Sequence, residues 1–211
     1  MKKIIGCVAA AALAAAAMPA TAAGWYAGVS LGNTYGQVNN GRIESDLRSL
    51  GFSSASVSGD TKDFGGRAFL GRHVLPWLSV EGYYADLGDT NWRATTVPEG
   101  TVSARIESKA YGIALLPGFS PAKNLMVFGK LGIARAEAKA SFASSGFAEL
   151  ESSSRKDTST AAIYGLGAAW RFEGSNAFVR LDLDSHDNLG SNEIGGKFKA
   201  RAAHVGFGLG F

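Results

Sequence analysis

Six ionisable residues lie in the middle of segments where apolar side chains alternate with small or polar ones. Three are basic and three acidic, so their formal charges sum to zero: Arg67, Glu81, Lys130, Arg180, Asp182 and Asp184. An unpaired buried charge costs several kcal/mol, and a balanced set therefore predicts side chains that pair with one another. We interpret the six residues as a charge network that fills an enclosed interior, with a gated ion pathway through the same charges as the alternative.

Histidine is the side chain best suited to proton transfer near neutral pH, and the chain contains three. Asp184 and His186 alternate onto one face, and Ser191 and Glu193 follow shortly after. These are the residue types of a Ser–His–acid hydrolytic set. We favour a simpler interpretation, in which a strand ends here and continues as a polar loop.

The other candidates for chemistry lead to no site. His73 lies near a short turn and is expected at a membrane interface, whereas His204 is expected to fill the interior among glycines. Asp182 and Asp184 would lie too far apart on a strand for a loop-type calcium site. No helix follows the glycines of residues 206–210, as a phosphate-binding loop requires. The sequence therefore predicts no catalytic residue, no metal and no cofactor.

The elements that must position these residues are strands. Apolar residues recur at every second position, which places one set of side chains on each face of a strand. In the last segment, for example, Val205, Phe207 and Leu209 alternate with Gly206 and Gly208. Eight such segments can be marked, at residues 25–38, 62–74, 77–88, 104–116, 123–138, 158–172, 177–187 and 197–211.

The connections between these segments alternate in length. Three are short turns, at residues 75–76, 118–121 and 173–176. The others are longer and polar, at residues 39–61, 89–103, 141–157 and 188–196. Short turns on one rim and long loops on the other are typical of an outer-membrane barrel.

Aromatic residues also fall into two groups, one at the short-turn end of the segments and one toward the long-loop end, as in the aromatic belts at the two membrane–water interfaces. The short-turn group consists of Trp25, Tyr26, Trp77, Trp170, Phe172, Phe178 and Phe211, and the long-loop group of Tyr35, Tyr83, Tyr84 and Trp92. In hydrocarbon every backbone polar group must pair within the protein, so a β structure can span only if it closes. The sequence therefore predicts an all-β fold, an eight-stranded antiparallel up-and-down transmembrane β-barrel with a filled interior.

The first 23 residues have the three-part pattern of a secretory signal peptide. Two lysines precede an Ala-rich apolar run over residues 4–18, and small residues follow. We predict a cleaved signal at residues 1–23 and one barrel domain at residues 24–211. The single cysteine, Cys7, falls within the signal, so no disulfide is expected in the barrel.

Charge and hydropathy exclude two other classes of protein. Removal of the two signal lysines lowers the formal net charge from +3 to +1, and no dense basic cluster of the kind that binds nucleic acid is present. The mean hydropathy of +0.03 excludes a polytopic helical membrane protein.

Short motifs along the chain resemble, in order, the OmpA-like or outer-membrane protein β-barrel domain superfamily. They are GWYAGVSLG at residues 24–32, VEGYY at 80–84, GKLG at 129–132, YGLGA at 164–168, VRLD at 179–182 and the terminal Phe211. The resemblance implies an eight-stranded barrel with both ends in the periplasm and a last strand, ending in Phe211, that the barrel-assembly machinery recognises as an assembly signal. The larger members add a peptidoglycan-binding domain, which is not expected here.

The resulting expectation is an integral protein of the bacterial outer membrane that is not an enzyme. Its role would be structural, or one of surface interaction through long extracellular loops. The expected partners are outer-membrane lipids and lipopolysaccharide, the barrel-assembly machinery, and host or surface ligands at the loops, with a monomeric state and no nucleic acid.

Three alternatives compete with this expectation. One is a narrow ion-conducting pore. Another is a lipid A hydrolase at His186, although Asn188 stands where the related deacylases have serine. The last is a periplasmic ligand-binding barrel, which conflicts with the glycine-rich inner faces and apolar outer faces.

Overall fold

The computed structural model describes residues 24–37, 54–60, 62–97, 100–146, 154–189 and 198–211. The signal predicted at residues 1–23 lies outside the described residues, as do Ser191 and Glu193. Within the described ranges no helix is long and apolar enough to cross a membrane.

The described residues form one continuous antiparallel sheet. Its strands are β1 (Trp25–Gln37), β2 (Ser54–Asp60), β3 (Lys62–Leu75), β4 (Leu78–Val97), β5 (Gly100–Ala122), β6 (Leu125–Gly146), β7 (Ser154–Arg171), β8 (Ala177–Leu189) and β9 (Phe198–Gly210). Both β2 and β3 pair with β4, and β2 does so beyond the end of β3. The two therefore occupy a single position in the barrel.

The sheet closes because its first and last strands pair along their whole length. The β1–β9 register runs from Tyr26↔Gly210 to Gln37↔Lys199. Around the rest of the barrel β1 pairs with β3, and from β3 to β9 each strand pairs with the next one in the chain. Closure leaves no strand edge exposed at the height of the membrane. The predicted eight-stranded antiparallel up-and-down barrel is confirmed.

Side chains divide cleanly between the outside and the inside of this barrel. Outward side chains are large and apolar, and Ile113, Leu131, Leu166 and Val205 are each more than half exposed. Along β8, buried inward residues alternate with more exposed outward residues. An exposed apolar surface that surrounds a charged interior is the reverse of a soluble protein and is what a lipid solvent requires.

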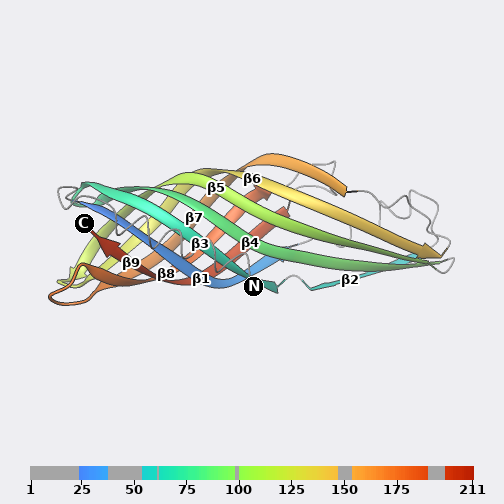
Figure 1. The fold of residues 1–211 in the computed structure, drawn as a ribbon, viewed down its shortest axis with the longest axis horizontal. Coiled ribbons are helices and arrows are strands. Elements are labelled where there is room, and N and C mark those ends of the chain that lie inside the picture. Colours follow the sequence, from blue (N-terminus) through green and yellow to red (C-terminus); the bar gives the residue numbers. More distant parts are fainter. Residues whose placement is uncertain (1–23, 38–53, 61, 98–99, 147–153, 190–197) are drawn as a thin grey trace.

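The loop end of the barrel differs from the sequence-based expectation. Most of residues 89–103, expected as a loop, belongs to β4 and β5, which pair as far as Thr96↔Gly100. The expected loop at residues 141–157 likewise contains the end of β6 and the start of β7. Figure 1 shows β4, β5 and β6 continuing well past the other strands, with β2 alongside. The prediction was wrong here because this stretch is mostly polar, and the apolar alternation that continues into it, as at Val102 and Ala104, is weak.

A bulge marks the point where β4 leaves the barrel wall. The β4–β5 register shifts between Asp86 and Asp89, and Gly88 has φ +76° there. Asp63 on β3 accepts a hydrogen bond from the backbone N–H of Asp89 at 2.6 Å. Bulges of this kind bend and twist a strand, which allows the hairpin to continue away from the closed wall.

The aromatic belts are partly as predicted. Tyr35 and Tyr84 lie exposed on the outside toward the loop end, and Trp77 and Trp170 toward the turn end. Three of the residues assigned to belts instead point into the barrel: Tyr26, Tyr83 and Phe178. Their predicted side was wrong, because Tyr83 shares the strand parity of the inward Glu81 and Phe178 that of the inward Arg180. The side chain of Trp92 lies outside the described set.

Candidate functional site in the barrel interior

Four strands place the six charged residues at one level of the interior. Arg67 comes from β3, Glu81 from β4 and Lys130 from β6, whereas Asp182 lies between Arg180 and Asp184 on β8. Each occupies an inward position flanked by outward apolar residues. The register places Glu81 opposite Gly71 and Lys130 opposite Gly165, so glycines leave the room that the long side chains need.

The six side chains form one connected set of ion pairs. Lys130 Nζ lies 2.6 Å from Asp182 Oδ1 and 2.8 Å from Asp184 Oδ1. Arg67 pairs with Asp184 at 2.8 Å and with Glu81. Arg180 pairs with Asp182 at 2.7 Å and with Glu81. Every cation therefore contacts at least two carboxylates.

Burial makes this network energetically important. All six residues are at most 5% exposed, and Lys130 and Glu81 are fully enclosed. Breaking a buried pair by removing one partner typically costs ~3–5 kcal/mol, because the remaining charge is left uncompensated. The three cations and three carboxylates compensate each other without any external ion.

Aromatic rings hold the two guanidinium groups in place. The Arg180 guanidinium carbon lies 4.6 Å from the ring centres of both Phe69 and Phe128. That of Arg67 lies 4.5 Å from the ring centre of Tyr83. Sequence reasoning missed these rings, although Phe69 and Phe128 each stand two residues from a network charge. That spacing places them on the same inward face.

A layer of uncharged polar groups borders the network and overlaps it in height, since Ser30 lies opposite Arg67 and His204 opposite Asp182 in the strand register. The ring nitrogens of His186 and His204 and the hydroxyl oxygens of Ser30 and Thr34 are buried and make no protein hydrogen bond. Both histidines are at most 2% exposed. His186 is thus enclosed inside the barrel and is not open to a lipid substrate. Asp184, its expected partner, pairs with Arg67 and Lys130 instead.

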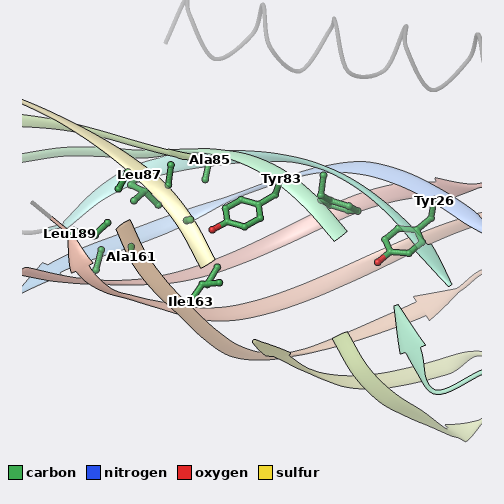
Figure 2. Close-up of a cluster of buried hydrophobic side chains, with 12 residues drawn as sticks. Tyr26, Tyr83, Ala85, Leu87, Ala161, Ile163 and Leu189 are labelled. Atoms are coloured by element: carbon green, nitrogen blue, oxygen red, sulfur yellow. The ribbon is translucent and has the colours of Figure 1, made fainter. Parts of the chain in front are cut away.

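Beyond this polar layer the interior becomes apolar. Figure 2 shows Leu87, Leu189, Ala85 and Ala161 gathered at one end of the cluster, with Ile163 and Tyr83 between them and Tyr26 at the other end. The apolar side chains here are 4% exposed or less. An ion that moved along the interior would meet mostly apolar side chains here, with Ser108 among the buried polar ones.

At the turn end, His73 and Phe211 take different positions. His73 lies at the inner mouth, where its Nδ1 is 2.8 Å from Ser79 Oγ, instead of on the lipid-facing surface. Phe211 exchanges backbone hydrogen bonds with Trp25 at 2.9 and 3.2 Å, which extends the β1–β9 seam. Its role as an assembly signal stays a prediction.

The described residues include no group of three or more histidine, cysteine or acidic side chains placed to hold a metal ion. The three carboxylates of the network already face three cations. The arrangement is therefore suited to cross-linking four strands electrostatically.

Comparisons with known proteins agree with this architecture. Residues 5–211 match the family model of the outer membrane protein beta-barrel domain. The outer-membrane protein OprG from Pseudomonas aeruginosa is similar in structure, with a TM-score of 0.56 and 15% identity over 90% of this chain and 96% of that one. The N-terminal β-barrel domain of Pseudomonas aeruginosa OprF has a TM-score of 0.50 and 13% identity over 89% and 98%.

No curated protein sequence matches the chain. At such identities the two structures support the fold alone, and the family match carries the assignment. With its closed wall, apolar outer surface and ionic interior, this chain belongs to the outer membrane protein beta-barrel domain family and lies in the bacterial outer membrane.

Proposed function

We propose that this barrel has a structural and surface-interaction role, in which the sealed wall anchors an extracellular sheet. The observation that carries the proposal is the extension of β4, β5 and β6, joined by β2, beyond the closed wall. Connections at this end of an outer-membrane barrel face the cell exterior, and the short turns face the periplasm. Residues 1–23 would direct export and be removed.

The extension is built as a sheet and presents a broad surface. Arg105 on β5 pairs with Asp89 on β4, and Lys156 on β7 pairs with Glu137 on β6 at 3.0 Å. Exposed cross-strand charge pairs of this kind stabilise a sheet modestly. A rigid extension costs less entropy on binding than a flexible loop, which favours contact with a second surface.

Truncation of the extension tests this role. A variant in which residues 90–106 are replaced by an Asn-Gly turn retains the whole barrel wall. We expect a bacterial strain lacking the gene to regain resistance to detergent when it expresses either the full chain or the truncated variant. Adhesion to cultured epithelial cells should return only with the full chain.

Heat-modifiable migration on gels and surface labelling would verify equal folding and display of the two forms. Equal adhesion by both forms would contradict the surface role of the extension. Failure of both forms to restore detergent resistance would contradict the structural role.

A further inference from the structure

The turn end of the barrel contains a cavity that borders the charge network at Arg180. Its volume is about 630 Å³, which is within the range of small-molecule sites. The inner end is closed by Arg180, Phe128 and Tyr26, and the outer end is bordered by residues of the short turns, among them Pro76 and Asn124. The cavity thus opens toward the periplasm and ends blindly at the network.

Aromatic and aliphatic groups form the body of this cavity. Tyr26, Phe128 and Phe178 line it from three different strands, together with Leu116 and Met126. The rings of Tyr26 and Phe178 meet edge to face, with their centres 6.1 Å apart. Such a wall offers faces and edges for a planar apolar group, which prefers offset or edge-to-face contacts.

The charged side chains of the lining are all basic. They are Lys123, Arg171 and Arg180, and no acidic side chain is present in the lining. Arg180 is compensated by Glu81 and Asp182, whereas none of the ion pairs of the described residues involves Lys123 or Arg171. Arg171 occupies an inward position on β7 and lines the mouth together with His73.

Two buried polar groups also belong to the lining. Ser79 is 1% exposed, and its hydroxyl meets His73 Nδ1. When that hydroxyl donates, the neutral imidazole carries its proton on Nε2 and can donate to a bound anion. In addition, Nε of Arg180, a residue 3% exposed, makes no hydrogen bond with the protein. An apolar pocket with a few converging polar donors is the usual form of a ligand site.

We propose that this cavity, which we call the periplasmic pocket, binds a small aromatic carboxylate from the periplasmic side. Arg171 and Lys123 hold the carboxylate at the rim, because a guanidinium matches its planar geometry with two parallel hydrogen bonds. The rings of Tyr26, Phe128 and Phe178 contact the aromatic body of the ligand. This site is independent of the role proposed for the extracellular extension.

The test uses the intact barrel in lipid nanodiscs and 4-(trifluoromethyl)phenylacetate as the probe, with binding followed by ¹⁹F NMR. We expect saturable binding that is roughly tenfold weaker in the Arg171→Gln/Lys123→Gln variant, since the charge-assisted hydrogen bonds to the carboxylate are lost. The matched control, Lys199→Gln/Arg201→Gln, neutralises two exposed cations at the opposite end and should bind as the unmodified chain does.

Two further measurements separate specific binding from partition into lipid. The neutral amide of the probe should bind at least fivefold more weakly than the probe itself. Phe178→Ala should lower the affinity of the barrel for the probe without changing the ratio of its affinities for the acid and the amide. Equal affinity of the acid for the unmodified chain and for Arg171→Gln/Lys123→Gln would overturn the proposal. Signal changes that match those of empty nanodiscs would overturn it as well.

Discussion

Glu81 bridges Arg67 and Arg180 within a closed ring of ion pairs, whose other links run through Asp184, Lys130 and Asp182. Its carboxylate pairs with Arg67 on β3 and Arg180 on β8, and it accepts a hydrogen bond from the Tyr26 hydroxyl at 3.2 Å. These partners lie on strands far apart in the chain. A single carboxylate therefore links strands across the interior and compensates two guanidinium groups that water does not reach.

We predict that Glu81→Gln destabilises the barrel by ~3–5 kcal/mol, because it leaves buried positive charge in excess. Urea unfolding in lipid vesicles, followed by gel migration of the folded form, measures this change. The control is Glu107→Gln, whose carboxylate is about half exposed and pairs only at 3.9 Å, so its effect should stay within ~0.5 kcal/mol.

The same network offers a compensating change. Adding Arg67→Met to Glu81→Gln removes the excess cation, and the double variant should recover part of the lost stability. A double variant less stable than either single variant would contradict the assignment of the loss to uncompensated charge.

At the scale of the elements, close approach of neighbouring strands decides which inward positions accept a side chain. A Cβ atom at Gly32 on β1 would overlap the backbone carbonyl oxygen of Ala203 and contact His204 on β9. These two strands form the seam that closes the barrel. Backbone atoms cannot move aside as a flexible side chain can, so the seam itself would have to shift.

We predict that Gly32→Ala lowers the free energy of unfolding by ~1–3 kcal/mol, as expected for overpacking. Gly82→Ala is the matched control, because a Cβ there lies 3.9 Å from its nearest neighbour, the Leu70 carbonyl oxygen. Folding yield in vesicles and urea midpoints compare the two variants. Equal losses in both would show that strand propensity, not the seam, determines the effect.

At the scale of the whole molecule, the interior is layered along the barrel axis. The periplasmic pocket lies at the turn end, the charge network with His204 beside it comes next, and the buried residues Leu87 and Leu189 lie toward the loop end. Each layer presents different partners to a solute, and the network and the apolar layer are both closely filled. This sequence of layers argues against an open aqueous path.

We therefore expect the barrel to show no stepwise conductance in planar lipid bilayers. Lys130→Met and Glu81→Gln, which change the charge of the network, should leave the traces flat. Regular current steps in the unmodified chain whose size changes in Lys130→Met would instead support the narrow pore.

The sequence by itself determined the all-β class, the number of strands across the membrane and the inward position of the six charges. These features follow from alternation, which is local and can be read one segment at a time. For the same reason the residues of the inner face at positions 67, 81, 130 and 180 could be identified without knowledge of their partners.

Only the tertiary structure decided which charges pair, which aromatic rings enclose Arg180, and how far β4 and β5 continue. Pairing depends on register and on closure between β1 and β9, which join residues far apart in the chain. Tyr26 and Phe178 show why the sequence did not decide these contacts. An aromatic residue near a strand end is equally suited to an interfacial belt and to the inner face, so its residue type does not distinguish the two. The extended hairpin is paired through cross-strand hydrogen bonds, and its few apolar residues, such as Val102 and Ala104, give only a weak periodic signal.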